Sequence, residues 1–261
     1  MARFGVCTGA ENLDVLERAG YDYIELAVAG ALKPEQPDEE VMPALIEQFN
    51  HCGLKAEAFN VFLPGDLRVV GDGIDESRQA RYFQAAFARA ARLGGQVVVF
   101  GSGAARRIPE GFSAERAQSQ TIAFSQRAAQ AAARHNLRVA VEPLNAGECN
   151  QILSVAEGAV LVRAVDHPNF GVLSDLYHVT KGGQSYEETR DAGALLTHVH
   201  VAGAQNRRAP VAEDQAYLTP FFRVLKEMGY AGRISVEGSW DNLPAQAAST
   251  LDVLRRAWDA A

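Results

Sequence analysis

The sequence of 261 residues has little cysteine, and its three cysteines lie far apart at Cys7, Cys52 and Cys149. Three scattered thiols cannot form a disulfide framework, and they lack the paired spacing of a thiolate zinc site. Free cysteines are typical of proteins that stay in a reducing compartment. We therefore predict a cytoplasmic protein.

Long hydrophobic runs and an excess of positive charge are missing as well. No apolar stretch approaches the length of a membrane span, and the N-terminus passes straight into a predicted strand without the apolar core of a signal peptide. The formal net charge is −7, which gives no electrostatic attraction to nucleic acid or to anionic membranes. We expect neither as a partner.

The sequence does contain a strict alternation of short apolar runs and amphipathic helical segments. We count eight of each, and the runs begin near Arg3, Asp22, Lys55, Gln96, Arg138, Phe170, Thr197 and Gly232. Such alternation predicts a parallel sheet with helical crossovers, and the length suits a barrel of eight strand–helix units. Since no linker divides the chain, we predict an α/β protein with a single (β/α)₈ TIM-barrel domain over residues 1–261. The irregular stretch 60–75 could form a lid.

Four of the predicted strands end in a side chain that can bind a metal ion, namely Glu142, Asp175, His200 and Glu237. The carboxyl ends of barrel strands converge on one rim, where barrel enzymes place their chemistry. A lone acidic residue at a strand end is usually a solvated loop residue or a helix cap, but three partly buried carboxylates would repel one another strongly without a cation. We predict that the four side chains bind one divalent metal ion, Mn²⁺ in preference to Mg²⁺ or Co²⁺, because an oxygen-rich ligand set suits these ions.

Such a metal site predicts chemistry next to a carbonyl group. An octahedral ion with four protein ligands has two open positions, which suit the adjacent oxygens of an α-hydroxy ketone. The cation would polarise the carbonyl, acidify the neighbouring C–H and stabilise the resulting cis-enediolate. Glu142 and Glu237 could each reach one face of that carbon, so we predict that they are the catalytic acid and base. The expected substrate is a small carbohydrate: a ketose, a ketose phosphate or a keto acid.

Four segments resemble motifs of one group of barrel enzymes. Residues 141–150 resemble E-P-x-N-x-x-E-x-x-N, slightly compressed after Glu148, and residues 175–178 resemble D-x-x-H. Residues 198–200 resemble H-x-H, and residues 229–237 resemble G-Y-x-G…E. In this order and spacing, the chain resembles the xylose isomerase-like TIM-barrel superfamily. Within it, the sugar phosphate isomerase/epimerase group is the most similar, with its D-tagatose (D-psicose) 3-epimerases and hydroxypyruvate isomerase-like proteins.

The resemblance implies roles for further residues. Glu148 and His178 would bind substrate oxygens beside the metal, and Arg207 would contact the substrate. Arg207 lies one residue further from the metal histidine than the arginine of the ketose epimerases, so Arg208 is a rival for this role. Those enzymes continue with a P-G-x-G turn, whereas Pro210 is followed here by Val-Ala-Glu-Asp. A particular sugar therefore does not carry over.

Several other polar residues have open or structural interpretations. We expect His198, which alternates with His200, to face the helices and to be structural. Glu25 and Asn60 follow the second and third strands, and substrate contact and a structural role are equally good interpretations of both. The segment 101–107 could hold a phosphate or carboxylate, but we slightly favour a tight loop with solvated arginines.

The leading prediction is thus a metal-dependent sugar isomerase or epimerase. The alternative is a metal-dependent dehydratase of the inosose or dehydroshikimate type, whose product would be lighter by one water. We reject the apurinic endonuclease branch, because it needs a three-metal cluster with more strand-end histidines than these six provide, and the negative charge opposes DNA binding. A homo-oligomer is compatible with the sequence, but no helix face identifies an interface.

Overall fold

The predicted strands form a closed parallel barrel in the computed structural model, which describes residues 2–261. Strands that follow one another in sequence are hydrogen-bonded neighbours, and β8 pairs with β1 to close the ring. The TIM barrel is therefore confirmed, and each strand begins within one residue of its predicted start. The strands are β1 (Arg3–Cys7), β2 (Tyr23–Ala27), β3 (Ala56–Asn60), β4 (Val97–Phe100), β5 (Arg138–Val141), β6 (Phe170–Asp175), β7 (Leu196–Val201) and β8 (Arg233–Val236).

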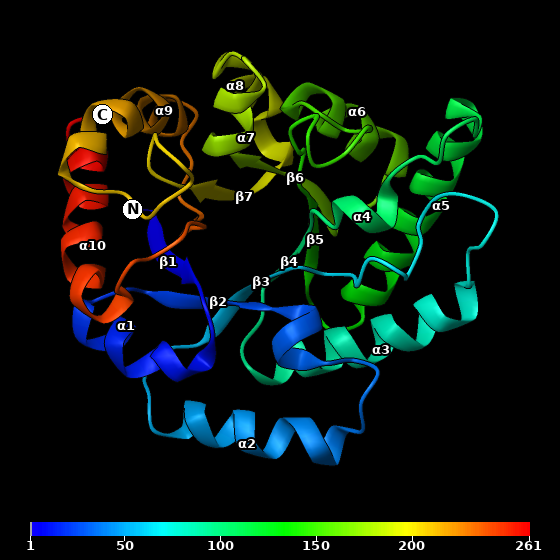
Figure 1. The fold of residues 1–261 in the computed structure, drawn as a ribbon, viewed down its shortest axis with the longest axis horizontal. Coiled ribbons are helices and arrows are strands. Elements are labelled where there is room, and N and C mark those ends of the chain that lie inside the picture. Colours follow the sequence, from blue (N-terminus) through cyan, green and yellow to red (C-terminus); the bar gives the residue numbers. More distant parts are fainter. Residues whose placement is uncertain (1) are drawn as a thin grey trace.

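Helices surround the ring of strands (Figure 1). The longer ones are α1 (Leu13–Ala19), α2 (Asp38–Asn50), α3 (Glu76–Arg92), α5 (Ala114–Ala133), α6 (Val155–Val165), α9 (Gln215–Glu227) and α10 (Leu243–Asp259). The prediction of one helix per strand missed several short elements. These are the helices α4 (Gly103–Arg106), α7 (Leu176–Lys181) and α8 (Glu187–Ala192), together with the single turns η1 (Ala10–Asn12), η2 (Val28–Leu32), η3 (Gly193–Leu195) and η4 (Ala212–Asp214). The pair Gly182-Gly183 divides the sixth crossover into α7 and α8, because glycine ends helices readily.

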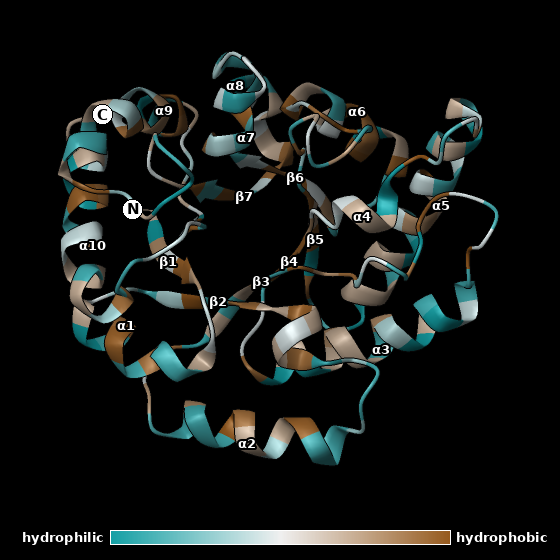
Figure 2. Cartoon of the chain, in the orientation of Figure 1, coloured by the Kyte–Doolittle hydropathy of each residue, from teal (hydrophilic) through white to brown (hydrophobic). Residues whose placement is uncertain are grey.

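The interior of the barrel has an apolar side and a polar side. Most buried apolar residues lie between the strands and the helices, which mix hydrophilic and hydrophobic residues (Figure 2). A second apolar cluster consists of Tyr23, Ala58, Val97, Val99, Ala140 and Leu173 from β2 to β6. The buried polar side chains Glu25, His198 and Ser235 come from β2, β7 and β8. Polar side chains therefore gather along one side of the interior.

The irregular segment that follows β3 is fastened to the core. The side chains of Phe62, Leu67 and Val69 are buried, and the hydroxyl of Tyr82 on α3 donates a 2.7 Å hydrogen bond to the Phe62 carbonyl. Val61 is different, because its side chain is 51% exposed. The segment thus presents one apolar side chain to solvent next to the end of β3.

Two further findings bear on the expected environment of the chain. Among residues 2–261, no helix has both the length and the apolar character that crossing a membrane requires. All three cysteines are free.

Gly5 provides a test of the packing inside the barrel. A Cβ atom at Gly5 would lie 2.4 Å from Cε2 of Tyr23, and the Tyr23 hydroxyl is bound to Ser235 Oγ at 2.8 Å, so the ring cannot yield freely. We predict that Gly5→Ala lowers the free energy of unfolding by about 1–3 kcal/mol, measured by urea denaturation. Gly73→Ala is the control, because an added Cβ at Gly73 meets nothing within 4 Å. Equal stability of the two variants would contradict the prediction.

Candidate active site

The four predicted metal ligands meet at the carboxyl end of the barrel. Glu142 directly follows β5, Asp175 ends β6, His200 lies in β7, and Glu237 directly follows β8. One potential ligand atom from each lies within 4.8 Å of those of the other three. Each preceding strand is apolar and buried, so it carries its final polar side chain to a rim that is largely closed to solvent. We call these four residues the carboxylate–histidine cluster.

Burial and charge shift the pKa values in this cluster. Burial raises the pKa of Asp175 to about 7, against the opposing effect of Arg207. Burial and the charge of Glu237 raise the pKa of Glu142. Burial also acts to raise the pKa of Glu237, but His200 and Arg207 outweigh it and lower the value to about 2. His200 and Arg207 therefore stabilise Glu237 as a carboxylate, whereas burial keeps Glu142 and Asp175 less acidic than usual. A cation between the carboxylates would relieve the repulsion among them.

The donor set fits a divalent metal ion. Oε1 of Glu142 is buried and has no hydrogen-bond partner in the part of the chain that the structure describes. Nδ1 of His200 lies 3.4 Å from this oxygen and 3.1 Å from Oε2 of Glu237. Three carboxylates and one imidazole are the ligands that Mn²⁺, Mg²⁺ and similar ions accept.

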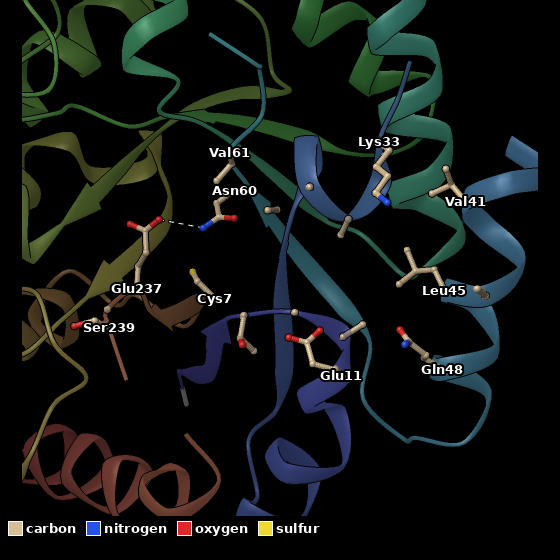
Figure 3. A pocket seen from close by; sticks show the side chains of 18 of the residues that line it. Cys7, Glu11, Lys33, Val41, Leu45, Gln48, Asn60, Val61, Glu237 and Ser239 are labelled. Atoms are coloured by element: carbon tan, nitrogen blue, oxygen red, sulfur yellow. Dashed lines mark hydrogen bonds between the residues drawn. The ribbon is translucent and has the colours of Figure 1, made fainter. Parts of the chain in front are cut away.

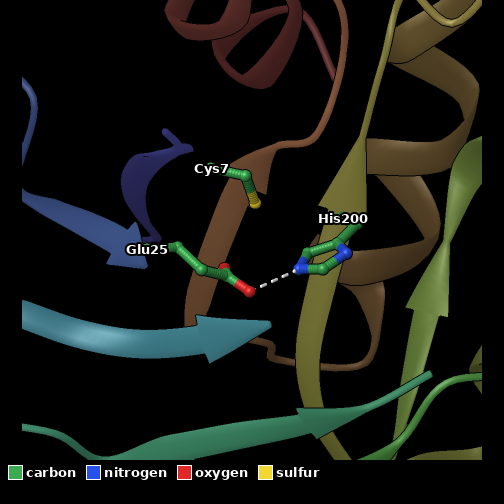
Figure 4. Close-up of side chains that lie close together, drawn as sticks. All are labelled: Cys7, Glu25 and His200. Atoms are coloured by element: carbon green, nitrogen blue, oxygen red, sulfur yellow. Dashed lines mark hydrogen bonds and ion pairs between the residues drawn. The ribbon is translucent and has the colours of Figure 1, made fainter. Parts of the chain in front are cut away.

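Glu25 supports the cluster from below. Its Oε1 lies 3.0 Å from Nε2 of His200 and its Oε2 lies 2.8 Å from Nε2 of His198. Figure 4 shows the first of these contacts, with the Cys7 thiol beside it. Burial would raise the pKa of Glu25, but the two imidazoles hold it well below its usual range. Because Glu25 is fully buried and binds Nε2, it orients the His200 ring with Nδ1 toward the other three residues of the cluster.

The expectation that His198 faces the helices is wrong. Residues two apart on a strand point to the same side, so His198 lies inside the barrel below His200, and the ring centroids are 5.0 Å apart. Burial lowers the pKa of His198. The neutral ring contacts Glu25 in the barrel interior.

His178 directs an unpaired donor at the cluster. Its Nδ1 faces the backbone N–H of Asn145 at 3.1 Å and the side-chain amide of Asn145 at 2.9 Å. Two donors on Nδ1 place the proton on Nε2, and burial lowers the pKa of His178 to about 3, so the ring is neutral. Nε2 has no hydrogen-bond partner within residues 2–261, and it lies 3.6 Å from Asp175 Oδ2 and 3.9 Å from Glu148 Oε2. This N–H is free to donate to a ligand oxygen.

Asn145 is a residue to which the sequence analysis gave no role. Besides contacting His178, its amide nitrogen donates a 2.7 Å hydrogen bond to Oε1 of Glu148. One buried side chain therefore positions both residues that the resemblance assigned to substrate binding. The position of Asn145 within the motif of residues 141–150 was the only sign in the sequence that it has a role.

The structure distinguishes between the two rival arginines. The guanidinium of Arg207 contacts Oε2 of Glu237 and lies 4.7 Å from the ring centroid of Tyr177. Arg208 instead pairs with Asp214, which also accepts a backbone hydrogen bond that shapes the same loop. Arg207 therefore reaches the cluster, whereas Arg208 fastens the loop that carries it.

The sequence analysis offered two interpretations of the segment 101–107, an anion site or a loop with solvated arginines, and neither describes Arg106. This side chain is fully buried, and its guanidinium donates to the carbonyl oxygens of Gly101 at 2.6 Å, Glu142 at 2.7 Å and Gln151 at 2.9 Å. All three acceptors are backbone groups, so Arg106 is neither a solvated arginine nor free to bind a phosphate. It holds the ends of β4 and β5 together and thereby fixes the backbone at Glu142.

A pocket of about 890 Å³ opens beside the cluster. Figure 3 shows Glu237 and Asn60 at one end and the side chains of α2 at the other. The Asn60 amide donates a 3.0 Å hydrogen bond to Oε1 of Glu237. Asn60 thus orients a cluster residue, and it also lines the pocket.

The sequence and the fold are both similar to those of known proteins. The family model described as the xylose isomerase-like TIM barrel matches residues 13–257. The L-ribulose 3-epimerase of Methylomonas sp. (strain DH-1) is 28% identical over 247 residues, which cover 92% of this chain and 82% of that protein. A D-psicose 3-epimerase of Clostridium cellulolyticum H10, solved with D-tagatose, has a TM-score of 0.84 at 16% identity, over 98% of this chain and 99% of that one. A 3-keto-D-glucoside 4-epimerase of E. coli has a TM-score of 0.80 at 22% identity, with the same coverage. The two structural likenesses show a shared fold.

Metal binding by the cluster can be measured through stability. We predict that Mn²⁺ added to chelator-treated protein raises the melting temperature by roughly 5 °C or more at a hundredfold excess over its dissociation constant, because only the folded state holds the site. Asp175→Asn should lose most of this shift, since it removes a ligand charge while an asparagine still caps α7. Asp252→Asn, at an exposed position on α10, should keep the full shift. A wild-type protein that Mn²⁺ does not stabilise would contradict the assignment.

Proposed function

Because the chain belongs to the xylose isomerase-like TIM barrel family, we propose that it is a divalent-metal-dependent ketose 3-epimerase. Such an isomerase inverts the carbon next to the carbonyl group of a small ketose. One observation carries the proposal: ligand atoms of three carboxylates, two of them buried, and of a buried imidazole from four consecutive strands lie within 4.8 Å of one another. The similarity to an L-ribulose 3-epimerase over 92% of the chain supports it.

The cluster residues Glu142, Asp175, His200 and Glu237 would hold the metal ion, with Mn²⁺ as the preferred cation because of the oxygen-rich donor set. When bound, the cation supplies Lewis acidity that polarises the substrate carbonyl. Glu25 serves this site indirectly by holding His200 with Nδ1 toward the cluster.

The two glutamates perform the proton transfers. One carboxylate removes the proton from C3 of the ketose, and the electron pair of that C–H bond moves into the C2–C3 bond to give a cis-enediolate. The other glutamate, in its protonated form, then delivers a proton to the opposite face of C3, which restores the carbonyl and inverts the centre. Glu142 and Glu237 suit this division because they come from β5 and β8, which are not adjacent in the ring.

Three neighbouring side chains would hold the substrate oxygens. The free Nε2–H of His178 donates to one of them, and the half-exposed carboxylate of Glu148 accepts from a hydroxyl group. Arg207 adds a positive charge beside Glu237, where charge develops on the substrate oxygen. The bound ketose would therefore take over contacts that these groups now make with the cluster.

Exchange of the C3 proton with solvent tests the two-carboxylate scheme. We predict that Glu142→Gln and Glu237→Gln each reduce epimerisation by at least about a thousandfold, because an amide neither accepts nor delivers the proton. Deuterium incorporation at C3 of D-fructose, D-psicose and L-ribulose, followed by NMR in deuterated water with Mg²⁺, would measure this loss. Glu213→Gln, at an exposed rim residue, is the control and should behave as the wild type.

Retained epimerisation in both glutamine variants would contradict the scheme. A product lighter by one water would instead identify a dehydratase, an activity that the compared relatives do not favour.

The arginine pair gives a second kinetic test. Arg207→Ala should raise KM for the ketose about tenfold or more, because it removes a charged hydrogen bond next to the substrate. Arg208→Ala should leave KM nearly unchanged and lower the melting temperature, because its partner Asp214 is buried and stays behind without its counter-charge. Steady-state kinetics and thermal unfolding of both variants separate the roles. Equal small effects of the two substitutions on KM would contradict this role and indicate that Arg207 is a solvated loop residue.

A further inference from the structure

The pocket beside the cluster is larger than a single ketose requires. Its volume of about 890 Å³ lies near the upper end of the roughly 300–1,000 Å³ range of pockets that hold drug-sized ligands, and a ketose is much smaller than such ligands. Glu237 and Arg207 line the end at the cluster, and one face of α2 lines the other. A ketose that reacts at Glu237 would therefore leave the α2 end of the pocket empty.

The α2 end is built for an uncharged, partly apolar group. Its helix face presents Val41 and Leu45, one turn apart, with the exposed residues Ala44 and Gln48 beside them (Figure 3). Lys33 is the one cation at this end within the described residues, and the carboxylates of Glu11 and Glu40 line the same space. This balance does not favour a phosphate group, whereas amide, ammonium and carboxylate groups can all bind sugar hydroxyls.

Val61 lines the pocket beside Asn60 (Figure 3) and has an unusual backbone conformation. It has a φ of 45°, a left-handed conformation that is strained for a β-branched residue. Its side chain is 51% exposed, and Val160 is the only other exposed large apolar residue within residues 2–261. Strain of this kind is often kept where a ligand binds. Val61 and Leu45 both line the pocket, and each offers an apolar side chain to the C–H groups of a sugar ring.

We propose that the natural substrate is a glycosylated ketose, whose second, uncharged sugar ring occupies the α2 end of the pocket against Val61 and Leu45. This inference rests on the proposed epimerase function, because the first ring must place its C3 between Glu142 and Glu237. Hydroxyl groups of the second ring would bind Gln48 and Lys33.

The test compares D-fructose, D-fructose 6-phosphate and 6-O-glucosyl-D-fructose as substrates of the Mn²⁺-loaded full-length protein. The expected kcat/KM for C3 epimerisation is at least about tenfold higher for the glucosylated ketose than for fructose, because the second ring adds binding energy. Ala44→Trp, which fills the α2 end from an exposed helix position, should reduce that value about tenfold and leave fructose within about twofold. Glu39→Trp, on the same helix but outside the pocket, should change neither.

The possible outcomes separate the two proposals. Equal kcat/KM for fructose and its glucoside, a preference for the phosphate, or an equal loss on both sugars in Ala44→Trp would overturn the glycoside inference and leave the epimerase in place. Absence of C3 exchange with every ketose would overturn the proposed function and, with it, the inference. The wild-type comparison decides the matter even if the tryptophan variant does not fold.

Discussion

Repulsion among three carboxylates confined within 4.8 Å at the mouth of the barrel is the constraint on which the site depends. Buried carboxylates are unfavourable unless they are paired or coordinated. The chain meets this requirement by alternating charge: Glu25 lies below His200, Glu237 lies beside it, and Arg207 contacts Glu237 from the loop side. The two cationic groups stabilise Glu237 in its charged form, while Glu142 keeps a buried oxygen without a hydrogen-bond partner in the described residues. A bound metal ion would give this oxygen a partner.

The supporting residues explain why the site can be held in place at a barrel rim made of loops. Arg106 binds three backbone carbonyls around the ends of β4 and β5, and Asn145 fixes both His178 and Glu148. The side chains of Arg106 and Asn145 are buried, which limits competition from solvent for these contacts. Glu142, His178 and Glu148 are therefore restrained before any ligand binds, which lowers the entropy lost on binding.

The sequence predicted the strands and the cluster because both depend on local pattern. Apolar runs that end in Glu142, Asp175, His200 and Glu237 specify a strand and its functional end together. Strand geometry could also have predicted the orientation of His198. Residues two apart on a strand share a face, whereas the sequence analysis placed His198 and His200 on opposite faces. The roles of Arg106 and Arg207 could not be predicted from a local pattern. Arg106 finds its acceptors on distant backbone segments, and the choice of Arg207 over Arg208 depends on a loop in which Asn206 and Arg207 both adopt positive φ.

The cluster and most of the pocket lining come from different segments of the barrel rim. The cluster residues come from β5 to β8, and of these only Glu237 lines the pocket. The rest of the open space lies mainly against α2 and the segments that follow β1, β2 and β3, which contribute no cluster residue. Small residues such as Gly9, Gly30 and Ala31 line that space, so the loops there fill little of it. Since none of these residues belongs to the cluster, substitutions at these positions would change the shape of the pocket without replacing Glu142 or Glu237. For the proposed epimerase, selection of the substrate and catalysis would thus be separable, and the size of the first two loops would set how large a sugar the site accepts.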